Sequence, residues 1–257
     1  MLPQSAPQIV SFSDITKTFE NGTVALQDLS LEIRQGEFVS LLGPSGCGKS
    51  TALRLLAGLS EPNSGRLNWA DDTMSVPDHD LSFVFQEPTL MPWATVFENV
   101  RLPLKVRGIG KVEARGRVMS ALELVGLERF EKSYPRELSG GMKMRVSIAR
   151  ALVTEPKVLL MDEPFAALDE ITRFKLNNEL LEFWSKFGLT VVFVTHSVFE
   201  SVYLSSRILI MTSGPGRIVA DLPMTAPYPR DDDFRTSAEY ADTCRRVSHA
   251  LKDAMAA

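Results

Sequence analysis

The stretch that decides the fold is Gly43-Pro44-Ser45-Gly46-Cys47-Gly48-Lys49-Ser50-Thr51. It matches the pattern Gly-x-x-x-x-Gly-Lys-(Ser/Thr), which cradles phosphate groups when it joins a strand to a helix. The apolar run Phe38–Leu42 precedes this stretch, and Thr51–Leu59 follows it with leucines at helical spacing. We therefore predict a strand, a phosphate-binding loop and a helix, in that order.

The residue types in this loop suit a phosphate ligand. Glycines let consecutive backbone N–H groups turn toward one phosphate, and the N-terminal end of the following helix carries partial positive charge. Lys49 adds charge against the outer phosphates, and Ser50 can ligate Mg²⁺ through its hydroxyl. We expect one face of the helix to be buried, with Leu53, Leu56 and Leu59 on it.

Two carboxylates follow another apolar run. Val158–Met161 is typical of a buried strand, and Asp162 and Glu163 come directly after it. Asp162 is suited to hold Mg²⁺ through water, and Glu163 to orient and polarise an attacking water. The alternative is that both carboxylates cap a helix that begins near Pro164.

Five apolar runs predict an α/β fold in which helices cover a parallel sheet, because strands buried on both faces are almost continuously apolar. Gly214-Pro215-Gly216 follows the last run and predicts a purely structural turn. The five runs are Phe38–Leu42, Leu81–Phe85, Val158–Met161, Val191–Val194 and Ile208–Met211.

Polar residues follow the other four runs, at the carboxyl ends of the predicted strands. They are Gly43, Gln86, Asp162 with Glu163, and Thr195 with His196. In open α/β sheets this edge is where ligands bind. We therefore expect these residues to serve one site.

The remaining patterns predict two further parts. Ile9–Phe12 and Leu29–Ile33 alternate in polarity and flank the turn residues Asn21-Gly22, which predicts a small antiparallel side sheet. Val112–Val125 and Gly141–Leu152 carry apolar residues at helical spacing, which predicts a helical insertion between two halves of the main sheet.

Composition excludes several classes of protein. Apolar residues make up 44% of the 257 residues and charged residues 23%, as in globular proteins rather than disordered ones. The net charge of −4 provides no field for a polyanion, so no nucleic-acid partner is expected. No apolar run approaches the roughly twenty residues of a membrane span. The only two cysteines, Cys47 and Cys244, fit a reducing cytoplasm.

A second glycine-containing motif narrows the class of nucleotide protein. Leu138-Ser139-Gly140-Gly141-Met142 stands before the basic helical stretch Lys143–Arg150, where it would form a second anion site at a helix start. It resembles the signature sequence of ATP-binding cassette (ABC) ATPases, in which glutamine usually takes the place of Met142. The alternative is a glycine pair that merely starts a helix.

The resemblance extends to the other motifs of the family in their usual order. Gln86 corresponds to the glutamine loop, Asp169 in Ala167-Leu168-Asp169 to the D-loop, and His196 to the switch histidine. It implies a RecA-like P-loop NTPase core with an antiparallel side sheet and a helical insertion that carries the signature. It also implies a head-to-tail homodimer, in which each signature acts on the ATP of its partner. The signature residues are Ser139, Gly140 and Gly141.

The resemblance also implies the cofactors ATP and Mg²⁺ and a role for each motif. Glu163, His196 and Gln86 are the expected catalytic residues, with His196 at the γ-phosphate. The expected Mg²⁺ ligands are Ser50, Gln86 and Asp162. The expected ATP contacts are Phe19, which aligns with an adenine-stacking aromatic, Gly43, Pro44, Ser45, Gly46, Cys47, Gly48, Lys49, Ser50, Thr51 and Gln86.

Four of these residues have structural alternatives. His196 could be an ordinary histidine at a strand end, and Gln86 a loop residue with local hydrogen bonds. Asp169 could cap the following helix, which is compatible with its D-loop role. Phe19 could pack in the core, and the residues leave that choice open.

The resemblance covers residues 9 to about 220 and implies the domain organisation. We expect one ABC ATPase domain over 9–220, with a core of about 9–86 and 157–220 and a helical subdomain of about 87–156. Residues 221–257 form a tail that we expect to be helical.

The segment Gln86–Val100 and the Met142 variant resemble the nitrate, sulfonate and taurine branch of bacterial importers. The resemblance implies ATP-driven uptake of a small solute through separate permease subunits, supplied by a periplasmic or lipid-anchored binding protein. It places the ATPase at the cytoplasmic face of the inner membrane. Leu90, Met91 and Trp93 either receive a permease helix or pack internally.

Other functions remain as alternatives. The importer could carry a vitamin or pyrimidine precursor, or the chain could be a soluble ABC ATPase acting in translation or on DNA. Soluble members usually carry two cassettes, a long coiled coil or a zinc insertion, none of which this sequence shows. Exporters often fuse cassette and membrane segments, and a GTPase is excluded because the sequence lacks an Asn-Lys-x-Asp motif.

Overall fold

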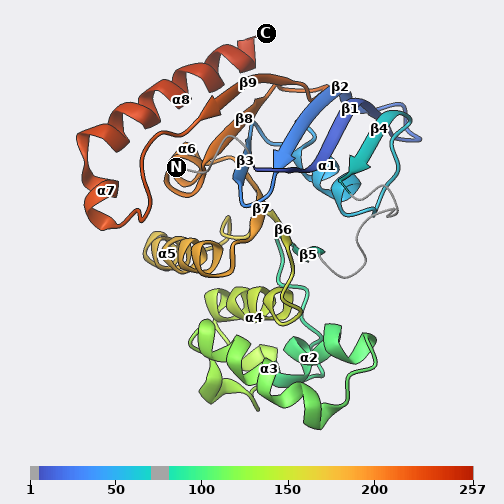
Figure 1. The fold of residues 1–257 in the computed structure, drawn as a ribbon, viewed down its shortest axis with the longest axis vertical. Helices are drawn as coiled ribbons and strands as arrows, with labels where there is room; N and C mark the ends of the chain where they lie inside the picture. Colours follow the sequence, from blue (N-terminus) through green and yellow to red (C-terminus); the bar gives the residue numbers. More distant parts are fainter. Residues whose placement is uncertain (1–5, 71–80, 257) are drawn as a thin grey trace. The chain divides into compact units, whose positions relative to one another are not determined.

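The computed structural model describes residues 6–70 and 81–256, which fall into two compact units (Figure 1). The first unit holds the described residues among 1–77 and 180–257, and the second those among 78–179. Helix α5 (Glu170–Phe187) carries the chain from the second unit back into the first. Each unit therefore has its own strands and helices.

The first unit contains a sheet in the strand order β7-β3-β8-β9. The central strand β3 (Phe38–Leu42) pairs in parallel with β7 (Thr190–Thr195) and with β8 (Arg207–Met211). The edge strand β9 (Ile218–Pro223) is antiparallel to β8. Every residue of β3 and β7 is buried, which confirms the prediction of a parallel sheet from continuous apolar runs.

A second sheet of the first unit is antiparallel, in the order β2-β1-β4. It consists of β1 (Gln8–Thr18), β2 (Val24–Arg34) and β4 (Ser64–Trp69). The predicted side sheet is confirmed, but β4 was not predicted. Most residues of β4 are exposed, so no alternation of apolar and polar residues marks it in the sequence.

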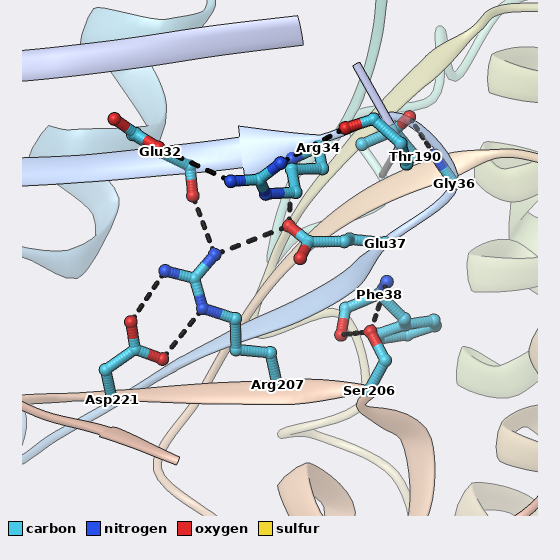
Figure 2. Close-up of polar contacts among 10 residues, drawn as sticks. Glu32, Arg34, Gly36, Glu37, Phe38, Thr190, Ser206, Arg207 and Asp221 are labelled. Carbon is cyan, nitrogen blue, oxygen red and sulfur yellow. Dashed lines mark hydrogen bonds and ion pairs between the residues drawn. The ribbon is translucent and has the colours of Figure 1, made fainter. Parts of the chain in front are cut away.

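Arg207 on β8 ties the two sheets of the first unit together (Figure 2). Its guanidinium donates hydrogen bonds to both carboxylate oxygens of Asp221 on β9, at 2.7 and 2.6 Å. It also donates to the main-chain carbonyl of Glu32 on β2 at 2.8 Å and lies 3.4 Å from the carboxylate of Glu37. The hydrogen bonds to Asp221 raise the pKa of Arg207, so this link stays cationic. The link fixes β2 beside β8.

Helix α1 (Lys49–Leu56) is shorter than predicted. Its two predicted core leucines are fully buried, but Leu59 is 61% exposed. Gly58 adopts a φ of +66°, and the N–H of Leu59 bonds back to the carbonyl of Arg54 at 2.8 Å. The placement of Leu59 on the buried face was wrong, because this left-handed glycine ends the helix first.

The second unit contains a parallel strand pair and a group of helices. Strand β5 (Leu81–Val84) pairs with β6 (Val158–Asp162). The strands and both predicted helices are confirmed with ends shifted by one residue, and α2 is additional. The elements of the helical part are α2 (Val96–Val106), α3 (Lys111–Leu124), η1 (Glu128–Phe130), η2 (Pro135–Glu137) and α4 (Gly140–Leu152).

Besides α1 and the end of α5, the described part of the first unit contains one helix after β7 and two after β9. They are α6 (Val198–Leu204), α7 (Asp232–Thr236) and α8 (Ala238–Ala256). Helix α8 runs along β8 and β9 (Figure 1), and its own residues Cys244 and Val247 are buried. Helix α8 is therefore packed against the sheet.

The buried thiol of Cys244 on α8 makes the stability of the first unit sensitive to high pH. Burial raises the pKa of Cys244 to about 11 from its ordinary value of 9.0. The folded protein therefore holds this proton more tightly than the unfolded chain, and the resulting stability is complete below pH 9 and lost as the pH rises toward 11. We expect the free energy of unfolding, measured by urea titration, to fall over this range by about 2 kcal/mol more in the wild type than in Cys244→Ala. Equal decreases in the two proteins would contradict this prediction.

Candidate active site

The phosphate loop is shaped by two glycines that no other residue could replace without movement. A Cβ on Gly43 would lie 2.8 Å from the Sγ of Cys47 and 3.1 Å from the carbonyl oxygen of Met211. Gly48, the residue before α1, has a φ of +97°, and a Cβ there would lie 2.5 Å from the carbonyl oxygen of Ala25. The loop is therefore held tightly against its surroundings at both of its ends.

Lys49 lies inside this loop and is only 4% exposed. Its Nζ donates hydrogen bonds to the carbonyl oxygens of Gly43 and Pro44, both at 2.8 Å. Cys47 is buried, with its Sγ 3.9 Å from the same Nζ. The loop thus holds one buried ammonium against its own carbonyl oxygens.

The segment Thr195–Ser197, which we call the histidine loop, leaves the sheet beside the phosphate loop. In the parallel pairing of β3 with β7, Leu42 lies opposite Thr195. Gly43 and His196 therefore follow neighbouring positions at the same edge of the sheet. His196 is exposed at this edge.

A short hydrogen-bonded chain fixes the backbone on both sides of His196. The hydroxyl of Thr195 donates to the carboxylate of Glu200 at 2.5 Å and accepts from the N–H of Ser197 at 3.0 Å. The hydroxyl of Ser197 in turn accepts from the N–H of Glu200 at 3.3 Å, as the N-cap of α6. Thr195 was predicted at this edge, but the supporting role of Glu200 was not predicted, although the capping pattern Ser-x-x-Glu marks it.

Phe19 lies at the turn between β1 and β2. Phe19 is 42% exposed, and the Nζ of Lys17 lies 5.8 Å from the centroid of its ring. Core packing, the alternative that the sequence left open, does not describe this position. An exposed ring is instead available to stack on a planar ligand.

The two carboxylates of the second unit differ in environment. Asp162 ends β6 and is 7% exposed, whereas Glu163 is half-buried and has a φ of +44°. This left-handed conformation is uncommon for glutamate and is typical of functional sites. The helix predicted near Pro164 is absent from this described segment, and α5 begins only at Glu170. The capping alternative for the two carboxylates was therefore wrong.

Asp169 caps helix α5. Its carboxylate accepts a hydrogen bond from the N–H of Thr172 at 2.9 Å. This hydrogen bond lowers the pKa of Asp169, so the carboxylate is charged at neutral pH. The capping role predicted as an alternative for Asp169 is thus confirmed.

The signature residues form the start of helix α4. Ser139 is the N-cap, and its hydroxyl accepts a hydrogen bond from the N–H of Met142 at 3.3 Å. Ser139 and Gly140 are exposed, while a Cβ on Gly141 would lie 2.8 Å from Thr172. Because the oxygen of the Ser139 hydroxyl is the acceptor in this bond, its O–H can still donate a hydrogen bond beside the N-terminus of α4.

The expected site residues are divided between the two units. The phosphate loop, Phe19 and His196 belong to the first unit, and Gln86 and Glu163 belong to the second together with Ser139, Gly140, Gly141, Asp162 and Asp169. Among residues 6–70 and 81–256, no group of three or more acidic, histidine or cysteine side chains is gathered as a ready metal site. No helix in the same residues is long and apolar enough to cross a membrane.

Comparison with known protein families shows which family the chain belongs to. The profile described as "ABC transporter" matches residues 26–166, more than half of the chain. The chain belongs to the ABC transporter family. It is an ABC ATPase, which binds ATP and couples its hydrolysis to transmembrane transport.

This ABC ATPase has close relatives of similar length. An uncharacterized ABC transporter ATP-binding protein of Methanocaldococcus jannaschii is 46% identical over 93% of this chain and 90% of that protein. The aliphatic sulfonates import ATP-binding protein SsuB of Bacillus licheniformis is 44% identical over 90% of this chain and 89% of that protein. These matches confirm the resemblance to ABC importer ATPases.

A solved structure confirms the fold of the ABC ATPase. A bacterial ABC transporter cassette, solved as a dimer, matches with a TM-score of 0.76 and 34% identity over 85% of this chain and all of that chain. The same cassette was solved in a post-hydrolysis state with ADP and Pi, with equal similarity. The predicted P-loop NTPase fold is therefore confirmed.

Two residues that the sequence analysis missed hold the segment after Gln86. The guanidinium of Arg150 on α4 donates to the carbonyls of Pro88 and Thr89 at 2.8 and 2.9 Å. The amide of Asn99, which is fully buried, accepts from the N–H of Met91 at 2.7 Å and donates to its carbonyl at 3.2 Å. No sequence pattern marks these contacts, since each joins a helix to an irregular loop.

The exposure of Leu90, Met91 and Trp93 tests whether these residues pack internally, which was one of the two alternatives for them. Trp93 is 78% exposed, whereas Leu90 and Met91 are half-buried. Internal packing therefore does not describe Trp93 and accounts only in part for the other two.

Proposed function

We propose that this ABC ATPase is the nucleotide-binding subunit of an importer for a small solute of the sulfonate, taurine or nitrate type. The observation that carries this proposal is the 44% identity with the Bacillus licheniformis protein named for aliphatic sulfonate import. In this proposal a separate binding protein captures the solute outside the membrane. Permease subunits pass it inward, and the ATPase binds them at the cytoplasmic face of the inner membrane.

The phosphate loop holds the triphosphate of ATP in this proposal. The backbone N–H groups of Ser45, Gly46, Cys47, Ser50 and Thr51 surround the phosphates, and Pro44, which has no N–H, lies in the same loop. The buried ammonium of Lys49 already lies within this loop, and in this low-dielectric position its attraction to an anion is strong. Phe19 stacks on the adenine, as its exposed ring permits.

The residues also fit a magnesium ion. The hydroxyl of Ser50, the amide oxygen of Gln86 and the carboxylate of Asp162 are oxygen donors, which Mg²⁺ prefers. Asp162 is buried at the end of β6, where a fixed carboxylate can hold a cation directly or through water. When bound, Mg²⁺ neutralises charge on the β- and γ-phosphates.

Glu163 performs the proton transfer in this mechanism. Its carboxylate orients the attacking water and accepts its proton, while Gln86 helps to position the same water. His196 donates a hydrogen bond to the γ-phosphate and stabilises the charge that develops there. The shared sheet edge of Gly43 and His196 and the strained backbone of Glu163 support these assignments.

Hydrolysis requires a second subunit in this proposal. Ser139, Gly140 and Gly141 present a hydroxyl and backbone N–H groups at the exposed start of α4, to the ATP held by the phosphate loop of the partner. Asp169, exposed at the start of α5, lies at the same dimer interface. A lone subunit then has only half of each site and hydrolyses ATP slowly.

The permease binds at the segment Leu90–Trp93 in this proposal. The exposed indole of Trp93 offers a large apolar contact, and Arg150 and Asn99 hold the backbone around it. ATP closes the dimer, closure moves the permease through this contact, and hydrolysis opens the dimer again.

Growth on single nutrient sources tests the proposed solute. We expect a strain lacking this gene to grow normally on sulfate and to fail on alkanesulfonates or taurine as the only sulfur source. The wild-type gene restores growth, whereas Glu163→Gln, expressed at the same level, does not. Normal growth of the deletion strain on every sulfonate tested, with failure on nitrate or on a vitamin precursor, would instead assign one of those solutes.

A further inference from the structure

Arg230 is a buried cation at the C-terminal end of helix α6. It is only 4% exposed, and its Nη1 donates hydrogen bonds to the carbonyls of Val202, Tyr203 and Ser205, each at 2.9 Å. The last carbonyls of a helix have no partner within the helix, and their partial negative charge attracts a cation. Arg230 supplies both the hydrogen bonds and the charge that this helix end requires.

Two tyrosine hydroxyls form further hydrogen bonds between α6 and the segment around Arg230. The hydroxyl of Tyr203 on α6 donates to the carbonyl of Arg230 at 2.9 Å, and that of Tyr228 donates to the carbonyl of Leu204 at 2.8 Å. The guanidinium also lies over the rings of Tyr228 and Phe234, 4.1 and 5.4 Å from their centroids. Stacking and hydrogen bonding together fix the plane of this guanidinium.

Helix α6 depends on such contacts because it has only seven residues. A helix of this length is not stable alone in water, so its position must come from the residues packed around it. Helix α8 adds one more contact through the hydroxyl of Tyr240, which donates to the carbonyl of Phe199 at 2.9 Å. The tail therefore holds α6 at its end and at its side.

The other end of α6 carries the histidine loop. His196 lies directly before the N-cap Ser197, and the Thr195–Glu200 hydrogen bond joins the end of β7 to the first turn of α6. A shift of α6 would therefore move the backbone on both sides of His196. Because α6 has only seven residues, or about two turns, its C-terminal end at Arg230 and its N-terminal end at the histidine loop are close together.

We propose that Arg230 is a positioning residue for His196, and that residues 226–240 act as a brace that keeps α6 and the histidine loop in place beside the phosphate loop. This inference rests on the proposed contact of His196 with the γ-phosphate. It gives the tail a role in ATP turnover, which the importer function alone does not assign to it.

Kinetics of the purified full-length subunit test this inference. We expect Arg230→Ala to lower kcat for ATP roughly tenfold while the KM and Kd for ATP change less than about twofold, because the side chain of Arg230 bonds to the end of α6 and to Ala226 rather than to residues 43–51. Arg230→Lys should recover part of kcat, since one ammonium retains the charge but reaches fewer carbonyls. Arg245→Gln is the matched control, because Arg245 lies on the exposed face of α8, and it should leave kcat unchanged.

A double-mutant cycle separates positioning from a general loss of stability. In single-turnover measurements on the His196→Ala background, Arg230→Ala should have no further effect on the rate. Independent, multiplicative effects of the two changes, or an equal loss of ATP binding in Arg230→Ala, would overturn this inference alone. Wild-type turnover in His196→Ala would overturn both the His196 assignment and this inference. Since none of these assays contains a transported solute, their outcome is independent of the solute assignment.

If Arg230→Ala does not yield folded protein, the same measurements are made on Arg230→Lys. Reduced kcat with unchanged KM, and faster amide hydrogen exchange confined to residues 195–205, would support the inference. A wild-type kcat in folded Arg230→Lys that nevertheless shows this faster exchange would overturn it, because α6 would then be loosened without consequence for turnover.

Discussion

We expect Glu163→Gln to bind ATP with wild-type affinity and to hydrolyse it at least about 100-fold more slowly. The amide has nearly the same shape as the carboxylate, so it preserves the backbone at a φ of +44° and the surroundings of β6. It cannot accept a proton from the attacking water, and general-base catalysis is lost. Kd for ATP from fluorescence titration and kcat from phosphate release are the two measurements.

Glu155→Gln is the matched control for this substitution. Glu155 also belongs to the second unit and also has a positive φ, of 53°, but its side chain is 78% exposed in a surface loop. This variant should bind and hydrolyse ATP as the wild type does. Wild-type turnover in Glu163→Gln would remove Glu163 from the role of base, and loss of ATP binding would show that its part is structural.

We also expect two inactive variants, Lys49→Ala and Ser139→Ala, to restore ATP hydrolysis when they are mixed. Lys49→Ala should bind ATP roughly 10- to 100-fold more weakly, because it removes a charged donor from the phosphate loop. Ser139→Ala leaves that loop intact but removes the signature hydroxyl. If each signature acts on the ATP of the partner, a mixed dimer contains one site in which both parts are intact.

Mixing the two variants should therefore restore ATP hydrolysis. Random pairing makes one complete site in half of the dimers, so up to about one quarter of the wild-type sites can return.

Thr95→Ala is the control for the loss of a helix cap. The Thr95 hydroxyl caps α2 at the same distance of 3.3 Å at which Ser139 caps α4, and its removal should leave turnover intact. No recovery on mixing, with each variant folded and able to dimerise, would mean that Ser139 serves the ATP of its own chain.

Much of the fold could be predicted because the signals are local. Val158–Met161 is apolar throughout, and Phe38–Leu42 has Ser40 as its one polar residue, so both runs are typical of strands buried on both faces or of short core helices. The residue after each run, Gly43 or Asp162, favoured strands at a ligand-binding edge. The end of α1 was misplaced because leucine spacing was given more weight than Gly58, whose left-handed backbone stops the helix.

The supporting residues could not be predicted because their partners are distant in the chain. Arg230 is an arginine near a proline in a polar stretch, which normally indicates an exposed side chain. Its burial depends on carbonyls more than 20 residues earlier, at the end of α6. Arg150 and Asn99 likewise act on an irregular loop whose path no periodicity describes.

The sequence by itself determined the chemistry of this ABC ATPase: a phosphate loop with Lys49, a strand that ends in Asp162 and Glu163, and a signature at a helix start. These features depend on residue types at fixed short spacings, which backbone geometry converts directly into local structure. Only the tertiary structure decided what holds each chemical group in place, because hydrogen bonds such as those of Arg230 join backbone and side chains whose proximity is created by folding.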